Sequence, residues 1–266
     1  MADTLSAKQT PEIRQIFVLG MHRSGTSLVA GILYKCGVFL GTELLGGNLS
    51  NPLGHFEDQR LIDLNDRILG AAGGTWYDPP PEEAISGQAG RMKEEIVGLL
   101  ALMPSGTWGW KDPRLSLTIE LFLPYVHNPA FIICDRESGA IAESLRHRDG
   151  FDIDRGLVIT GIYRDRIHSI LERHPDRRRM AVAYEELCSD PAVAISRLIS
   201  FAGLDVGARQ YRAAKKFVVH RDVIRKLERR IRRNELIKTG FRQLRKNPKT
   251  FLKNLVHHLR VKSSTQ

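Results

Sequence analysis

Residues 16–27 read Ile-Phe-Val-Leu-Gly-Met-His-Arg-Ser-Gly-Thr-Ser, and this stretch decides the fold of the chain. Its first four residues form a short apolar run whose length and content predict a buried strand. Gly20–Ser27 has the spacing Gly-x-x-x-x-Gly-x-Ser of a phosphate-binding loop, and a helix is predicted from Leu28 to about Cys36. A strand, a glycine-containing loop and a helix in this order open a nucleotide-binding α/β unit.

The remainder of the chain continues the alternation of strands and helices. Further strands are predicted at 131–134 and 180–183, and helices at about 57–69, 88–103, 137–148, 153–173 and 191–201. Such alternation predicts an α/β P-loop three-layer fold with a central, mostly parallel sheet flanked by helices. We expect a P-loop domain over residues 1–206 and a helical, basic C-terminal extension over 207–266.

The composition is that of a soluble globular protein, with 42% hydrophobic and 26% charged residues among 266. No apolar run approaches the length of roughly 18 residues that a transmembrane helix needs, and residues 1–15 lack the pattern of a secretory signal. The three cysteines, Cys36, Cys134 and Cys188, are widely spaced. They indicate reduced thiols in a cytoplasmic protein, and they predict neither a disulfide framework nor a metal site.

The net charge of +10 is unevenly distributed. Residues 207–266 hold 19 of the 40 Lys and Arg but only 3 of the 30 Asp and Glu, so the preceding 206 residues carry 21 and 27. The basic character therefore belongs to the extension, where amphipathic helices are predicted at about 221–236 and 248–260. A local basic segment indicates a local anionic contact, and attachment to the inner face of an anionic membrane is one hypothesis beside plain packing on the domain.

The loop sequence favours an anion site other than an ATPase site. Backbone N–H groups of such a loop, together with the N-terminus of the following helix, form a cradle for an anion. A kinase or ATPase would carry a lysine where this chain has Thr26, and here the cation stands three residues earlier, as Arg23. The absence of that lysine weighs against ATP hydrolysis.

Met21–Ser27 resembles the 5′-phosphosulfate loop of the sulfotransferases, whose common form is Pro-Lys-Ser-Gly-Thr-Thr. Arg23 matches the lysine of that loop, and Thr26 and Ser27 match its two threonines. A second motif of the family is an arginine after a strand with a serine eight residues later, both binding the 3′-phosphate of the sulfuryl donor. Arg136 and Ser144 match it.

Two weaker matches extend the resemblance to about residues 15–205. One is the stretch Tyr184–Leu187 with Asp190-Pro191 and Phe201–Leu204, and the other is Trp110–Arg114. The chain departs from the cytosolic aryl and steroid type, since it has neither a Lys-Thr-His-Leu-Pro segment nor a C-terminal Arg-Lys-Gly motif. It looks more like the bacterial and carbohydrate-type sulfotransferases, and other basic residues are candidates to complete the 3′-phosphate clamp: Arg212, Lys215 and Lys216.

The resemblance implies 3′-phosphoadenosine 5′-phosphosulfate (PAPS) as sulfuryl donor, no metal, and a hydroxyl acceptor that is a glycan or glycolipid. The residues that it places at the donor are His22, Arg23, Ser24, Gly25, Thr26, Ser27, Arg136 and Ser144. The expected catalytic residues are Glu57 as base and Arg23 and Lys111 as cations at the transferring group. His55, Asp58 and Asp112 are alternative bases, and Glu57 with Asp58 could instead only cap a helix.

Several alternatives stay open on the sequence. Lys111 could be an exposed lysine in a turn, and Trp76, Trp108 and Trp110 could line an acceptor pocket or cover the core. The rival functions are a P-loop kinase, in which Asp135 would hold Mg²⁺, and a non-catalytic nucleotide- or nucleic-acid-binding module. No sequence motif favours a specific nucleic acid partner.

Overall fold

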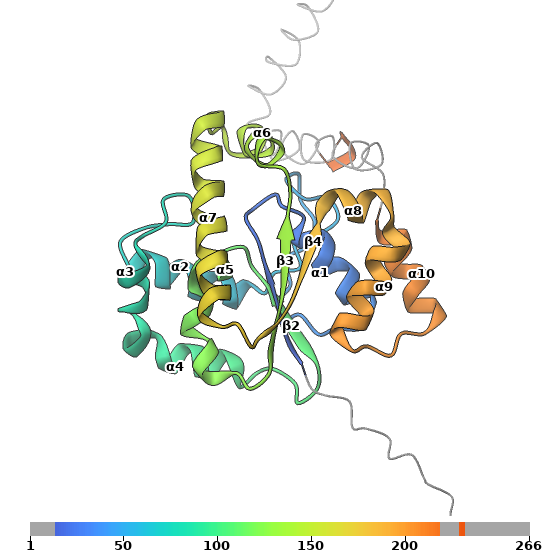
Figure 1. Cartoon of the computed structure of the whole chain (residues 1–266), viewed down its shortest axis with the longest axis horizontal. Helices are drawn as coiled ribbons and strands as arrows, with labels where there is room; N and C mark the ends of the chain where they lie inside the picture. The colour runs from blue at the N-terminus through green and yellow to red at the C-terminus, as the bar shows by residue number, and fades with distance from the viewer. Residues whose placement is uncertain (1–13, 219–228, 232–266) are drawn as a thin grey trace, which may run out of the picture. The chain divides into compact units, whose positions relative to one another are not determined.

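The computed structural model describes residues 14–218 and 229–231. Within them, four parallel strands form a central sheet in the order β2-β1-β3-β4 (Figure 1). The strands are β1 (Gln15–Leu19), β2 (Trp108–Lys111), β3 (Pro129–Asp135) and β4 (Arg178–Ala183). Phe17 of β1 pairs in register with Trp110 of β2 and with Phe131 of β3. β1 therefore has a neighbour on each edge, and its apolar run, residues 16–19, is fully buried.

Helices cover both faces of the sheet. Their bounds are α1 (Thr26–Lys35), α2 (Gln59–Ala71), α3 (Glu82–Ser86), α4 (Ala89–Leu100), α5 (Leu115–Thr118), α6 (Ser138–Asp149), α7 (Ile153–Arg173), α8 (Tyr184–Ser189), α9 (Pro191–Ala202) and α10 (Ala208–Phe217), with 3₁₀ turns at Ile119–Leu121 and Leu123–Tyr125. Apolar residues of α1, α9 and α10 form one core with Ile16 and Val18, and those of α2 and α4–α7 form the other with Phe17 and Leu19. The predicted three-layer α/β fold is confirmed.

Helix ends lie where the local chemistry places them. Asp58 caps α2 through a bond accepted from the Arg60 amide, which is why α2 begins at Gln59 and not at residue 57. Asp190 caps α9 ahead of Pro191. The prediction of a helix over 153–173 is confirmed to the residue by α7. None of the described helices combines the length and apolar character that a membrane span requires.

The described residues belong to two compact units. The first holds residues 14–46 and 54–218, and the second holds 47–53 and 229–231. Within the first unit α10 packs on α1, because Gly31 leaves room for the ring of Phe217. The expected domain limit at 206/207 precedes α10. The predicted helices at 221–236 and 248–260 lie outside the described residues, apart from 229–231.

Candidate active site

The predicted phosphate loop lies at the carboxyl end of β1. This strand has β2 on one edge and β3 on the other, so the chain passes from β1 to one side of the sheet and, after β2, crosses to the other side. In open α/β sheets the crevice at such a reversal of strand order is where ligands bind. The first amide groups of α1 lack partners within the helix and face this crevice with the positive end of the helix dipole. The loop therefore offers the predicted anion site.

Both glycines of the loop are required because other atoms lie where a side chain would begin. Gly20 and Gly25 have φ angles of 150° and 100°. A Cβ atom at Gly20 would lie 2.8 Å from the carbonyl oxygen of Cys134, and one at Gly25 would lie 2.9 Å from the ring of Tyr184. Since no other residue fits without displacing backbone or ring atoms, the loop keeps its narrow turn.

Arg23 joins the loop to helix α6. Its φ angle of 72° is in the left-handed region, which a side chain other than that of glycine adopts at a cost of about 1–3 kcal/mol. Its Nε donates a hydrogen bond of 2.8 Å to Oγ of Ser144. The structure thus brings together one residue from each of the two motifs that the sequence placed at opposite ends of the donor.

Arg136 completes this cluster. It follows β3, and its Nη1 donates to the carbonyl oxygen of Arg23 over 3.0 Å. Its guanidinium lies 4.4 Å from the centroid of the Tyr184 ring, a cation–π distance. Its Nε atom is buried without a partner in the described part of the chain. A buried donor in that state is available to an incoming anion.

Lys111 is the last residue of β2 and connects the loop to the segment before α2. Only 2% of it is exposed, so the alternative of an exposed turn lysine is wrong. Its Nζ donates to Oγ of Ser27 over 2.8 Å and to the carbonyl oxygen of His55 over 3.0 Å, and it forms an ion pair with Glu57. One ammonium group therefore bridges the phosphate loop and the predicted base.

Glu57 is a buried carboxylate that follows a strained backbone position. It is 6% exposed and follows Phe56, whose φ of 56° is, with that of Arg23, one of two left-handed values at non-glycine residues in the described chain. Burial raises the pKa of Glu57; Lys111 opposes this shift and Asp112 adds to it. A carboxylate with a raised pKa beside a cationic anion cradle suits proton acceptance.

The other candidate bases are otherwise engaged. Asp58 caps α2; burial alone would raise its pKa, but hydrogen bonds from Arg60 and Thr42 lower the pKa overall. Asp112 is fully buried and accepts hydrogen bonds from the side chains of Asn65 and Arg114. The structure therefore separates the two adjacent carboxylates: Asp58 caps the helix and Glu57 does not.

His55 and His22 are both neutral in this environment. Burial, and then the charge of Lys111, lowers the pKa of His55 to about 4, so this imidazole accepts a proton weakly. Burial and nearby arginines also lower the pKa of His22 well below its usual range. The His22 ring lies 4.2 Å from that of Trp76, and the structure shows no acidic partner for it among the described residues.

The three tryptophans have different places. Trp108 and Trp110 are 3% and 0% exposed and contact the Phe17 ring edge-on in the core. Trp108 and Trp110 therefore cover the core and do not line an acceptor pocket. Trp76 is half-buried beside His22 and is the one that borders the loop.

A buried polar chain behind Lys111 was not predicted. Asn65 donates to Asp112 and accepts from the hydroxyl of Thr118, and Arg114 joins Asp112 to Asp66. These bonds connect α2 to the end of β2 and to α5, and so fix the backbone that carries Lys111. The signal in the sequence was a polar Asn65 on the apolar face of α2, between Leu64 and Ile68 on the same helix.

The acid that a kinase would use to hold Mg²⁺ lies at the end of β3. Asp135 is exposed and paired with Arg164 over 2.7 Å, so the acid expected for a kinase is already occupied by a cation. The described residues contain no group of three potential metal ligands.

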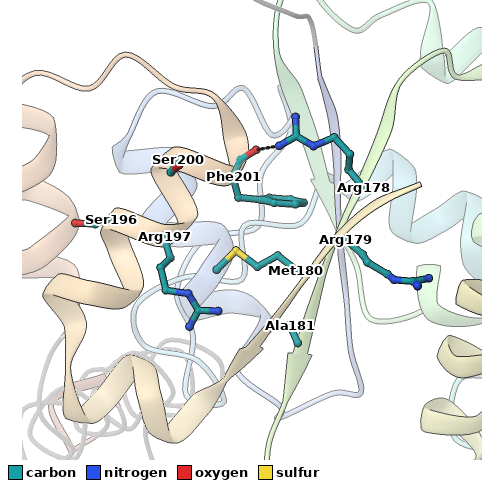
Figure 2. A pocket seen from close by; sticks show the side chains of 8 residues that line it. All are labelled: Arg178, Arg179, Met180, Ala181, Ser196, Arg197, Ser200 and Phe201. Carbon is teal, nitrogen blue, oxygen red and sulfur yellow. Dashed lines mark hydrogen bonds between the residues drawn. The ribbon is translucent and has the colours of Figure 1, made fainter. Parts of the chain in front are cut away.

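A groove of about 810 Å³ runs along β4 and α9, far in the sequence from the loop. It is lined by Arg178, Arg179, Met180, Ala181, Ser196, Arg197, Ser200 and Phe201 (Figure 2). It contains none of the predicted site residues.

The fold and the loop define the class: a P-loop α/β protein whose loop cation is an arginine in place of the lysine of ATP-hydrolysing enzymes. A family model described as "Sulfotransferase family" matches residues 15–208. The chain therefore belongs to the sulfotransferase family, and it is a PAPS-dependent sulfotransferase. The family resemblance inferred from the motifs is confirmed.

Three similar solved structures are 14–18% identical to this chain. The sulfotransferase domain of the olefin synthase of Synechococcus PCC 7002 is 18% identical with a TM-score of 0.49, covering 74% of this chain and 75% of that chain. Sulfotransferase STF9 from Mycobacterium avium is 17% identical with a TM-score of 0.46, covering 82% and 76%. Retinol dehydratase in complex with androsterone and inactive cofactor PAP is 14% identical with a TM-score of 0.41, covering 77% and 64%. Among curated proteins none matches the sequence.

Proposed function

We propose that this enzyme transfers the sulfuryl group of PAPS to a hydroxyl of a glycan or glycolipid, with Glu57 as base. The observation that carries the residue assignment is the position of Lys111, which contacts Ser27 of the loop and Glu57 at once. A cation in that position lies next to the proposed base and can stabilise the charge that develops on the leaving phosphate.

On the donor side, the loop residues 22–27 and the α1 amides hold the 5′-phosphosulfate. Arg136 and Ser144 bind the 3′-phosphate, and the hydrogen bond from Arg23 to Ser144 keeps the two phosphate sites in register. The Nε–H of Arg136 has no partner among the described residues and can donate to this phosphate. The donor-binding residues are therefore largely preorganised.

On the acceptor side, the hydroxyl oxygen forms a bond to sulfur while the bond from sulfur to the 5′-phosphate oxygen breaks. The hydroxyl proton passes to the Glu57 carboxylate, and adenosine 3′,5′-bisphosphate (PAP) leaves with one more negative charge on its 5′-phosphate than that phosphate had in PAPS. Arg23 and Lys111 stabilise that charge, and the low exposure of Lys111 strengthens the interaction because water screens it little.

The proposal for the acceptor rests on the likeness of the motifs to carbohydrate-type sulfotransferases. A glycolipid acceptor would agree with contact between the basic residues of 207–266 and an anionic membrane surface from the cytoplasmic side. Flotation with vesicles containing phosphatidylserine tests this contact: the full chain should float and a chain ending at residue 218 should not. A full chain that does not float would remove the membrane from the proposal, and equal flotation of both would place the contact outside residues 219–266.

Calorimetric titration with PAP, and separately with ATP and Mg²⁺, tests the donor assignment. We expect metal-independent binding of PAP that is weakened about 10- to 150-fold in Arg136→Ala, since a hydrogen bond to a charged group contributes roughly 1.5–3 kcal/mol. Arg91→Ala is the matched control, because Arg91 is an exposed residue of α4. A preference for Mg²⁺ and ATP, or equal effects of the two variants, would overturn the assignment.

A further inference from the structure

Three aromatic side chains form a continuous surface beside the phosphate loop. Trp76 and Tyr77 follow α2, and Phe151 precedes α7. The ring centroids of Trp76 and Phe151 are 5.9 Å apart, and those of Tyr77 and Phe151 are 6.0 Å apart. Tyr77 is 40% exposed. We call these three residues the aromatic wall.

The aromatic wall is fixed to the site and lies outside the donor-binding residues. The Trp76 ring contacts the His22 ring at a tilt of 43° with their centroids 4.2 Å apart, and the carbonyl oxygen of Trp76 accepts a hydrogen bond of 3.0 Å from the hydroxyl of the buried Tyr163. The carbonyl oxygen of Pro80 in the same segment accepts from Arg166 of α7 over 2.8 Å. The side chain of His22 is thus turned toward the wall, so the wall adjoins the first of the loop residues proposed to bind PAPS.

Two arginines lie over the aromatic wall. The guanidinium of Arg148 is 5.3 Å from the Trp76 ring, and that of Arg155 is 4.6 Å from the Phe151 ring and 5.6 Å from the Tyr77 ring. Arg148 comes four residues after Ser144, so both lie on one face of α6. Its charge reaches the site, because it contributes to the low pKa of His22 and of His55, after burial in each case.

The two arginines differ in their counter-charges. Arg148 pairs with Asp149 over 2.7 Å. Arg155 is exposed, and the described residues supply no ion pair to its guanidinium. A guanidinium stacked on a ring still presents its N–H edge for a bidentate bond to a carboxylate or sulfate.

We propose that the aromatic wall, with Arg148 and Arg155, is the acceptor subsite and selects an anionic saccharide, whose ring lies against the aromatic faces and whose acid group contacts the arginines. This proposal rests on the proposed sulfotransfer to a hydroxyl and specifies its substrate class. Aromatic faces bind the apolar side of a sugar ring, and an anionic group on that ring gains a charge-assisted hydrogen bond that a neutral sugar lacks.

Ligand-observed NMR titration of methyl glucuronide and methyl glucoside into the full chain saturated with PAP tests this selectivity. The two probes differ only in the acid group. We expect the glucuronide to bind about 10- to 150-fold more tightly, the range of one hydrogen bond between charged groups. In Arg155→Gln the preference should fall to within about threefold of unity while PAP affinity stays unchanged. Arg91→Gln is the control and should keep the preference.

The outcomes separate this proposal from the one on which it rests. If PAP binds but the two probes bind equally, or neither binds, the anionic subsite is wrong and sulfotransfer stands. If the preference persists in both Arg155→Gln and Arg148→Gln, another part of the protein supplies the selectivity. If PAP does not bind, the proposed function fails, and the subsite proposal fails with it. Tyr77→Ala, at an exposed ring, should weaken both probes to the same degree and leave their ratio intact.

Discussion

Replacing Glu57 by glutamine tests whether its carboxylate accepts the proton of the acceptor hydroxyl. Glutamine keeps an oxygen to which Lys111 can donate, but it has no carboxylate to accept a proton. A general base contributes about 10²–10⁴-fold to a rate, which corresponds to roughly 3–5.5 kcal/mol in the activation free energy. We expect kcat to fall by this factor and the affinity for PAP to change less than about threefold.

The same substitution has a cost in stability that has to be measured first. Removing one member of a buried ion pair costs about 3–5 kcal/mol, because the other charge is left uncompensated. Lys111 keeps its bonds to Ser27 and to the His55 carbonyl, and the amide oxygen of the new glutamine accepts a hydrogen bond in place of the lost carboxylate. We therefore expect a loss of only about 1–3 kcal/mol in the free energy of unfolding. Chemical denaturation measures this loss and shows at which temperature the variant is folded during the assay.

The pH profile separates a base from a structural carboxylate. The raised pKa of Glu57 means that the ionised, proton-accepting form is lost as the pH falls through a value above the usual range for glutamate. The kcat of the wild-type enzyme should therefore decline on the acid side, and that of Glu57→Gln should lack this decline. Asp58→Asn is the matched control, since asparagine also caps a helix, and it should keep both the rate and the profile. A Glu57→Gln enzyme with wild-type turnover would refute the reasoning.

Three further results are expected. Ser144→Ala removes the acceptor of the 2.8 Å bond from Arg23, so calorimetry should show about fivefold weaker PAP binding, equivalent to ~1 kcal/mol. Gly31→Ala would place a Cβ 2.1 Å from the Phe217 ring and should cost about 1–3 kcal/mol by denaturation; most of this cost should vanish in a Phe217→Ala background, and additive costs would contradict the contact. The pKa of His55 is lower in the folded state, about 4, than its usual value near 6.5, so its contribution to stability is complete above pH 6.5 and is lost as the pH falls toward 4. In His55→Gln the melting temperature should depend less on pH over this interval. An unchanged dependence on pH would contradict the lowered pKa of His55.

The fold followed from short apolar runs because a parallel sheet buries its strands on both faces. Residues 16–19 are fully buried in β1, as their composition predicted. β2 was harder to recognise, since its four residues include Gly109 and end in a lysine. That lysine is tolerated in a buried strand because Glu57 neutralises it, and this partner lies 54 residues away.

The site was predictable where both partners belong to one motif. Arg136 and Ser144 have a fixed spacing on a strand end and a helix, so their proximity to the loop could be inferred from the sequence. The difference between Glu57 and Asp58 could not, because it depends on where α2 begins: a helix starting one residue earlier would exchange their roles. Likewise, Trp108 and Trp110 share one face of β2, and only the helices packed against that face decide whether they contact a ligand or the core.

The contact between Gly31 and Phe217 has a practical consequence for anyone who shortens this protein. The family match stops at residue 208, whereas the ring of Phe217, nine residues further on, lies 5.4 Å from that of Phe56. Phe56 immediately precedes Glu57 in the chain. A fragment trimmed to the limits of the family likeness would lose α10, leave an apolar surface on α1 open to water, and loosen the residue next to the proposed base. Expression should therefore extend to at least Val218, and inactivity of a shorter fragment would say nothing about the chemistry of the intact enzyme.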